Sequence, residues 1–268
     1  MKKILLILTI LLTTLGLNAA DGVLTAQGQV KSGGYRFWFY NPDPMDELDP
    51  KPVVIFLHGR SLSGNDLNRV KRYGTIAAIE KGRDIDAYVI APQVPSGAFW
   101  EPDKIMDIVD WAWDNYNIDE DRVYVLGMSL GGFGAIDVAN AYPDRIAACL
   151  AMCGGSYNKD FSGLAQVPLW VIHGTADAAV PVSQSDRVVS EVKKLADDDR
   201  VIYQRVPGMN HSRPARFFYI PEVYDWLMSH SLQDAGRPVN REVFAVDATN
   251  TAYQGLKSTG KSKRRKKK

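Results

Sequence analysis

Cysteine is nearly absent from this sequence of 268 residues, which holds only Cys149 and Cys153. They stand four positions apart in IAACLAMCGG, an apolar run typical of a strand, where such positions lie about 13 Å apart. A disulfide needs Cα atoms within about 7 Å, so we expect two buried free thiols; a helical run would allow a bridge. No cysteine precedes Cys149, which excludes a lipid-modified cysteine near the N-terminus.

The sequence also lacks an apolar run of the roughly 20 residues that a membrane-spanning helix needs. Its first residues, MKKILLILTILLTTLGLNAA, combine two lysines, an apolar core at 4–12 and small residues at Ala19 and Ala20. This pattern is typical of a secretory signal peptide. We therefore expect residues 1–20 to be cleaved near Ala20, with export to the periplasm or the exterior and no stable membrane insertion. An uncleaved membrane anchor is the alternative.

Positive charge is concentrated at the C-terminal end, although the net charge of the chain is only +1. Of the 32 Lys and Arg residues, eight fall in residues 257–268 and two precede residue 21, which leaves 22 against 31 Asp and Glu, a net −9. Like charges without apolar neighbours cannot pack. We predict a disordered basic tail over 235–268, with attachment to an anionic polymer or to the acidic domain as the alternative. We expect no nucleic-acid partner.

Strand-like and helix-like segments alternate along residues 21–234. The apolar, β-branched runs typical of buried strands are 52–57, 87–91, 123–126, 147–152, 168–173 and 201–206. Helical spacing predicts helices over 103–117, 130–141 and 183–196 and from Pro221 onward. Near the start, VLTAQGQV and YRFWFY flank KSGG as a hairpin. This alternation predicts one α/β domain, a three-layer sandwich with a mostly parallel sheet and helices on both faces.

One serine is surrounded by glycines where an apolar run ends, in RVYVLGMSLGGFG. Ser129 follows the strand-like run 123–126 and precedes the predicted helix 130–141, so it falls at the carboxyl edge of the sheet, where sites of such folds lie. G-x-S-x-G between a strand and a helix is the pattern of a nucleophile elbow, in which small neighbours allow a strained turn. We predict that Ser129 is a nucleophile; an incidental serine in a glycine-rich turn is the alternative.

A serine nucleophile needs a base, and the chain has four histidines. His211 lies in the polar loop PGMNHSRP after the run 201–206, on the expected edge of the sheet, and is the predicted base. His58 and His173 each end an apolar run, and we expect them to organise loops. His230 is expected at the surface.

The acid that orients the base should come from the loop before His211. Asp177, in HGTADAAVP, follows the run 168–173 and is the predicted acid. Its rivals, Asp186 and the run 197–199, fall inside or at the end of a predicted helix, where solvated charge is the ordinary role. The chain order serine, aspartate, histidine is that of α/β-hydrolases.

Two backbone N–H groups are expected to stabilise an oxyanion. One belongs to Leu130, directly after the nucleophile, and the other to Arg60, after the run VVIFLHG. The sequence has no cluster of metal ligands, and GMSLGGFG lacks the Lys-Ser/Thr pair of a phosphate-binding loop. We therefore expect neither a metal nor a cofactor.

With these motifs, residues 52–229 resemble the single-domain α/β-hydrolases of the esterase D, phospholipase/carboxylesterase and polyhydroxybutyrate-depolymerase-like group, above all the secreted branch often labelled "predicted peptidase". The resemblance rests on LHGRSLSGND, APQVP followed by Trp100, the segment 118–155, HGTADAAVP and GMNHS. It implies the α/β-hydrolase fold and acyl transfer, and relatives that include acetylxylan and feruloyl esterases. Arg60 departs from the family, which usually has a small or apolar residue there.

The substrate is expected to be a small-molecule or polysaccharide-derived ester. Phe99 and Trp100 follow the run 87–91 and could form a wall for an aryl group or a platform for a sugar ring, with plain packing as the alternative. Arg60 could meet a uronic carboxylate. We expect carbohydrate-linked acetyl or hydroxycinnamoyl esters rather than long-chain lipids. A serine peptidase of the same fold and a catalytically silent carbohydrate-binding relative are the alternatives, and the oligomeric state is left open.

Overall fold

The computed structural model describes residues 22–45, 48–196, 200–243 and 246–257, so the predicted signal peptide 1–20 lies outside the described residues. The strands are β1 (Val23–Gln27), β2 (Arg36–Asn41), β3 (Lys51–Leu57), β4 (Tyr88–Gln93), β5 (Ile118–Met128), β6 (Ala148–Met152), β7 (Leu169–Gly174) and β8 (Val201–Val206). The α-helices are α1 (Thr75–Glu80), α2 (Pro102–Asn115), α3 (Leu130–Ala141), α4 (Ser183–Leu195) and α5 (Pro221–Met228). Short 3-10 helices are η1 (Arg60–Leu62), η2 (Leu67–Arg72), η3 (Leu164–Gln166), η5 (Arg213–Tyr219) and η6 (Val246–Asn250).

All eight strands belong to one sheet, in the order β1-β2-β4-β3-β5-β6-β7-β8. β1 pairs antiparallel with β2, and β2 pairs antiparallel with β4. Every other pairing, from β4 across to β8, is parallel. Parallel strands bring their carboxyl ends to one edge of the sheet. The loops that follow β3, β5, β7 and β8 therefore meet at that edge.

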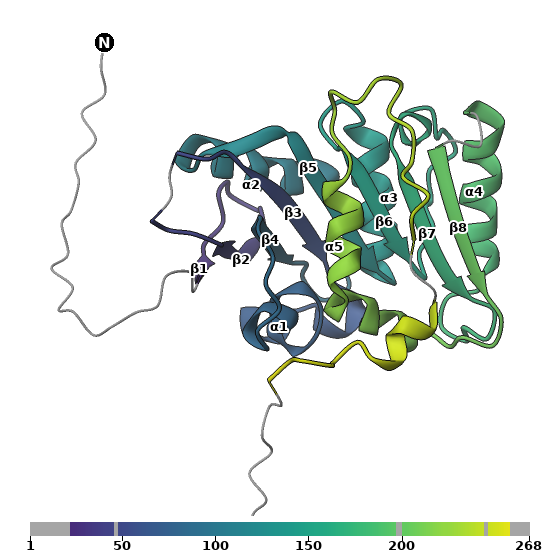
Figure 1. Cartoon of the computed structure of the whole chain (residues 1–268), viewed down its shortest axis with the longest axis horizontal. Helices are drawn as coiled ribbons and strands as arrows, with labels where there is room; N and C mark the ends of the chain where they lie inside the picture. Colours follow the sequence, from purple (N-terminus) through teal and green to yellow (C-terminus); the bar gives the residue numbers. More distant parts are fainter. Residues whose placement is uncertain (1–21, 46–47, 197–199, 244–245, 258–268) are drawn as a thin grey trace, which may run out of the picture.

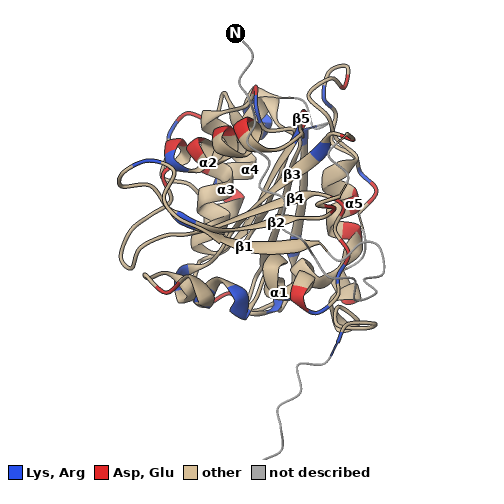
Figure 2. Cartoon of the chain, turned by 90° about the vertical axis from the view of Figure 1, so that its left-hand side faces the viewer, with Lys and Arg blue, Asp and Glu red and all other residues tan. Residues whose placement is uncertain are grey.

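Helices cover both faces of the sheet, as the alternation of elements predicts (Figure 1). The apolar side chains of α2, α3 and α4 pack on one face, and those of α1, η5 and α5 pack on the other. The central strands β4, β6 and β7 are buried along their whole length. In Figure 2 charged residues colour the outer helices and loops, whereas the sheet is mostly free of them. This is the predicted three-layer α/β sandwich.

The predicted runs and helices match the observed elements within a few residues, and the N-terminal hairpin is β1 and β2. Helix α1 was not predicted, because six residues are too few to display a helical period. Cys149 lies within β6 and Cys153 directly after it; both are free and buried, as expected. Within the described residues, no helix is both long and apolar enough to cross a bilayer.

The described residues after α5 pack against the domain, so the prediction of a disordered tail over 235–268 is wrong for residues 235–243 and 246–257. Its apolar side chains, among them Val239 and Ala252, pack into the core at irregular intervals, so they leave no periodic apolar pattern in the sequence. Residues 258–268 lie outside the described residues.

Arginine and tryptophan side chains add hydrogen bonds between this segment and the rest of the domain. Arg237 donates to the carbonyl oxygen of Pro143 at 2.7 Å. Trp226 of α5 donates its indole N–H to the carbonyl oxygen of Asn240, also at 2.7 Å. His230 is buried in the same place and accepts the N–H of Asn240 at 2.9 Å. The expectation of a surface His230 is therefore wrong, because the returning chain covers it.

Candidate active site

The turn between β5 and α3 holds Ser129 in a backbone conformation that few residues other than glycine adopt. Its φ of 59° and ψ of −124° are strained for a residue with a Cβ. Two backbone hydrogen bonds fix this conformation. The N–H of Ser129 donates to the carbonyl oxygen of Met152 at 2.8 Å, and the carbonyl oxygen of Ser129 accepts the N–H of Phe133 at 3.0 Å. The serine therefore stands on a rigid turn at the carboxyl edge of the sheet.

The glycines on either side of Ser129 are required by close backbone packing. A Cβ on Gly127 would lie 2.1 Å from the carbonyl oxygen of Gly131, and a Cβ on Gly131 would lie 1.8 Å from that of Leu57. Both distances are below any real Cβ contact. The two glycines of the G-x-S-x-G pattern are therefore required because β3, β5 and α3 approach each other closely at this turn.

His211 and Asp177 complete a series of hydrogen bonds with Ser129. The Nδ1 atom of His211 lies 2.6 Å from Oδ2 of Asp177, and its Nε2 atom lies 3.0 Å from Oγ of Ser129. An ionised carboxylate only accepts hydrogen bonds, so Nδ1 carries the proton and Nε2 is left to accept that of the serine hydroxyl. The three residues come from the loops after β5, β7 and β8, and the fold brings together all three predicted residues.

Asp177 is fixed in its ionised form. Burial alone would raise the pKa of its carboxyl group, but the N–H groups of Val180 and Ala179 and the ring of His211 outweigh burial and hold that pKa below its ordinary value. Oδ1 accepts these two N–H groups at 2.8 Å and 2.9 Å. The rival acid Asp186 instead accepts from Tyr203 and Arg205, away from His211.

Behind Asp177 lie the side chains of Cys153 and His173, whose potential metal-binding atoms are within 4.8 Å of one another and of the carboxylate. His173 is fully buried; it contacts Ser185 through Nδ1 at 2.7 Å and Val180 through Nε2 at 3.0 Å. Burial lowers the pKa of His173 and raises that of the Cys153 thiol, which disfavours the thiolate that a metal ion binds. We assign no metal to this group; His173 organises the loop, as expected.

Two helices begin beside Ser129, at the residues predicted to supply oxyanion donors. Leu130 and Arg60 are the first residues of α3 and η1, where backbone N–H groups have no partner inside the helix. Both residues line the cavity next to Ser129. The approach is close, since a Cβ on Gly59 would lie 3.4 Å from Cβ of Ser129. These are the positions predicted for the oxyanion donors.

Tyr73 fixes the loop that carries Arg60, and sequence reasoning missed it. Its hydroxyl accepts the N–H of Gly59 at 3.0 Å and lies 3.3 Å from Oγ of Ser61. Burial raises the pKa of Tyr73, which keeps the phenol protonated. The tyrosine lies between η2 and α1, and no pattern in the sequence relates it to residues 14 positions earlier.

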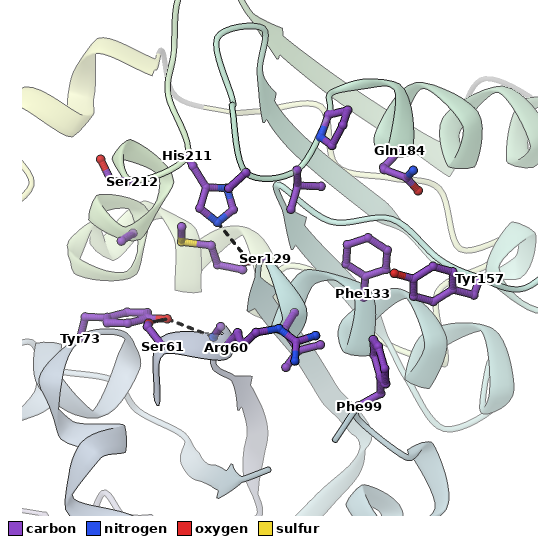
Figure 3. Close-up of a pocket in the computed structure, with 17 residues that line it drawn as sticks. Arg60, Ser61, Tyr73, Phe99, Ser129, Phe133, Tyr157, Gln184, His211 and Ser212 are labelled. Atoms are coloured by element: carbon purple, nitrogen blue, oxygen red, sulfur yellow. Dashed lines mark hydrogen bonds between the residues drawn. The ribbon is translucent and has the colours of Figure 1, made fainter. Parts of the chain in front are cut away.

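The cavity beside Ser129 has a volume of about 680 Å³. In Figure 3 it has two sides, which we name after their side chains: an aromatic side formed by Phe99, Phe133 and Tyr157, and a hydroxyl side formed by Ser61, Tyr73 and Ser212. On the aromatic side, the rings of Phe133 and Tyr157 stack at 5.4 Å, and Phe99 meets Tyr157 edge-on at 5.8 Å. One side can therefore receive a flat apolar group and the other a polar one.

The predicted wall residue Trp100 does not reach this cavity, and that expectation is wrong. Trp100 is 5% exposed, packs edge-on against His58 at 5.0 Å and donates its N–H to the His58 carbonyl at 3.3 Å. A Cβ on Gly134 of α3 would lie 2.6 Å from its ring, so the glycine makes room for the indole. Its neighbour Phe99 is 50% exposed and does line the cavity.

The loop after β6 supplies Tyr157, which the sequence did not single out. Ser156 donates to the Asp137 carboxylate at 2.5 Å, and Asn158 donates to the same oxygen at 3.0 Å. Arg187 of α4 donates to the carbonyl oxygen of Ser156. These bonds anchor the loop on both sides of Tyr157, so the exposed ring is held in place beside Phe133.

His58 serves the loop and not the chemistry, as expected. Its Nδ1–H donates to the carbonyl of Gly59 at 2.8 Å, and its Nε2 accepts the N–H of Val94 at 3.4 Å. Burial lowers the pKa of His58 from 6.5 to about 4, so the ring is neutral near pH 7. It ties together the loops that follow β3 and β4.

Comparison with known proteins agrees with this geometry. The phospholipase/carboxylesterase family matches residues 101–228. NocK of Nocardia uniformis subsp. tsuyamanensis, named as an esterase, is 27% identical over 60% of this chain and 51% of its own length. The bifunctional acetylxylan esterase/xylanase XynS20E of Neocallimastix patriciarum is 29% identical over 53% of this chain and 21% of its own length. The chain thus spans about half of NocK and a fifth of XynS20E.

A solved structure supports the same fold. The crystal structure of a thermostable esterase superposes with a TM-score of 0.65 at 23% identity, over 79% of this chain and 63% of that chain. The strand order, the strained turn at Ser129 and this likeness together define an α/β-hydrolase fold, and residues 101–228 of it match the phospholipase/carboxylesterase family.

Proposed function

We propose that this chain is a serine carboxylesterase that uses Ser129 as nucleophile, His211 as base and Asp177 to orient the base. The observation that carries the proposal is the hydrogen-bonded series from Asp177 through His211 to Ser129, which opens onto the cavity. A serine held this way is activated by the neighbouring imidazole. The relatives named as esterases support the same class of reaction.

In the proposed reaction, His211 takes the hydroxyl proton as Oγ of Ser129 attacks the ester carbonyl. The carbonyl oxygen becomes an oxyanion, which the N–H groups of Leu130 and Arg60 receive. The C–O bond to the alcohol then breaks, and the alcohol leaves with the proton from His211. A water molecule, deprotonated by His211, then attacks the acyl-serine. The bond from the acyl carbon to Oγ breaks, the acid leaves, and His211 returns the proton to Oγ of Ser129.

We further propose carbohydrate-linked acetyl or hydroxycinnamoyl esters as the substrate class. The aromatic side offers the faces of Phe133 and Tyr157 and the ring of Phe99, which fit the flat ring of a hydroxycinnamoyl group. The hydroxyl side offers hydrogen-bonding groups of the kind that a sugar alcohol needs. The likeness to an acetylxylan esterase/xylanase supports a carbohydrate-linked ester.

The experiment is a comparison of wild type with Ser129→Ala, using the exposed Ser162→Ala as the matched control. The substrates are two esters, methyl 4-hydroxycinnamate and 4-nitrophenyl acetate, and one amide, the 4-nitroanilide of 4-hydroxycinnamic acid. A fluorophosphonate probe labels a reactive serine. We expect hydrolysis of both esters well above the anilide, and labelling of wild type and Ser162→Ala only. Faster anilide cleavage would favour a peptidase, and absence of labelling and turnover would favour the silent relative.

A further inference from the structure

Among the described residues that line the cavity beside Ser129, Arg60 alone carries a fixed positive charge. Apart from Arg60 and His211, the described residues that line the cavity are uncharged, and no aspartate or glutamate is among them. Arg60 is exposed, and it forms no ion pair with any described residue. A fixed cation thus faces a space in which the described residues supply no counterion.

The guanidinium of Arg60 is placed on the aromatic side of the cavity. Its central carbon lies 5.4 Å from the centre of the Phe99 ring, a cation–π contact that directs the side chain (Figure 3). Phe99 in turn contacts Tyr157, and Tyr157 stacks on Phe133. The charged group and the three rings therefore border one space, which a single planar anion can occupy.

Electrostatics around the loop also favour an anion. Arg69 of η2 donates to the carbonyl oxygen of Ser61 at 2.8 Å, so a second guanidinium stands behind the loop that carries Arg60. The side chain of Asp177 is fully buried, and its carboxylate already accepts from Ala179, Val180 and His211. Residues 21–256 are net acidic, so the positive charge of Arg60 and Arg69 is opposite in sign to the net charge of the domain.

We propose that the cavity selects esters of flat aromatic or unsaturated acids that carry a second, free carboxylate, which Arg60 binds. A guanidinium pairs with a carboxylate through two parallel N–H···O bonds, and it stacks on aromatic faces because it is planar and weakly hydrated. The ring of the acid lies against Phe133 and Tyr157, and its distal carboxylate meets Arg60. This inference rests on the proposed esterase function and adds a preference among aromatic acyl groups, for those that carry a distal carboxylate over those that do not.

The test compares two methyl esters that differ only in one distal group. Methyl 4-carboxycinnamate carries a carboxylate, and methyl 4-carbamoylcinnamate carries a neutral amide of nearly the same shape. We expect wild type to favour the carboxylate ester by about tenfold in kcat/KM, a factor in keeping with one charge-assisted hydrogen-bonded pair. Arg60→Gln should bring the ratio close to one, and Arg60→Glu should reverse it. Raising the salt concentration should reduce the wild-type ratio, because the pair is exposed.

The control is Arg145→Gln, which removes the same net charge from a residue that pairs with Asp110 outside this cavity. It should keep the wild-type ratio. Equal kcat/KM for the two esters in wild type would overturn the inference, and so would the same ratio in wild type and Arg60→Gln. The esterase function is tested separately, by hydrolysis of methyl 4-hydroxycinnamate.

If no ester is hydrolysed, the esterase function fails and the anion site is judged by binding alone. Calorimetric titration with 4-carboxycinnamate should then show binding to wild type that weakens about tenfold in Arg60→Gln. Equal binding to both, or binding to neither, would overturn the anion site.

Discussion

The hydroxyl group of Tyr73 accepts the backbone N–H of Gly59 at 3.0 Å, directly before the residue whose own N–H is the proposed oxyanion donor. A Cβ on Gly59 would lie 2.8 Å from this hydroxyl, so the contact also depends on the glycine. The bond fixes the peptide plane between His58 and Gly59, one residue before the N–H of Arg60. Tyr73 is therefore a positioning residue for the proposed reaction, and it acts through the loop.

Tyr73→Phe should lower kcat by about 10-fold to 100-fold and change KM little. The variant keeps the ring but removes the acceptor of the Gly59 N–H, so the loop that presents the Arg60 N–H is held less firmly; loss of a whole oxyanion donor typically costs about 10²–10³-fold in kcat. Steady-state kinetics on 4-nitrophenyl acetate measure the effect. Tyr142→Phe, which removes a hydroxyl bonded to exposed Asp103, is the control. A Tyr73→Phe enzyme with unchanged kcat would show that the loop needs no such support.

Asp177→Asn should lower kcat by about 10³–10⁴-fold while the protein still folds. The amide can donate to Nδ1 of His211, which places the imidazole proton on Nε2 and leaves no base for Ser129. Asp186→Asn, at the rival acid, should retain nearly full activity, because Asp186 bonds Tyr203 and Arg205. Greater damage from Asp186→Asn than from Asp177→Asn would contradict the assignment of the acid.

Trp100→Ala and Phe99→Ala should separate packing from substrate contact. Trp100 is 5% exposed, so its truncation should lower the free energy of unfolding by about 3–5 kcal/mol. Phe99 is 50% exposed, so Phe99→Ala should change stability little but raise KM for methyl 4-hydroxycinnamate. Urea unfolding and Michaelis–Menten kinetics measure the two effects. A stable Trp100→Ala protein with a raised KM would restore Trp100 as a substrate wall.

Stability should rise with pH between about pH 4 and 6.5 because His58 is buried in its neutral form. Burial lowers its pKa from 6.5 to about 4, so in this window the unfolded chain binds a proton that the folded chain does not. One such group contributes up to about 1.4 kcal/mol per pH unit to the slope of the unfolding free energy. Urea unfolding at several pH values should give a smaller slope for His58→Gln than for wild type. Identical slopes would mean that His58 titrates alike in both states.

The C-terminal segment should support the loop that carries His211. Arg213 of η5, two residues after His211, donates to Thr249 at 3.0 Å and to Asn250 at 2.7 Å. Truncation after Val243 should therefore lower both stability and kcat, since the buried Thr249 and its bonds are lost. Truncation after Lys257 should leave kcat on 4-nitrophenyl acetate unchanged. Thermal unfolding and kinetics of the two truncated chains decide the matter, and equal behaviour of both would show that residues 244–257 give no support.

The sequence by itself determined the order of strands and helices and the candidate residues Ser129, His211 and Asp177. These signals are local: an apolar run predicts a strand, and a glycine-flanked serine after it predicts a strained turn. Because parallel strands carry their loops to one edge, strand order alone was enough to expect that three distant residues meet.

Only the tertiary structure decided which side chains border the cavity and which are buried. The sequence gives no reason to distinguish the adjacent aromatic residues Phe99 and Trp100. In the structure, Phe99 lines the cavity, whereas Trp100 fills the space beside Gly134. Tyr73 and Tyr157 reach the site from segments without a motif. Their roles depend on packing between residues far apart in the chain, and such packing has no period or local pattern that a sequence displays.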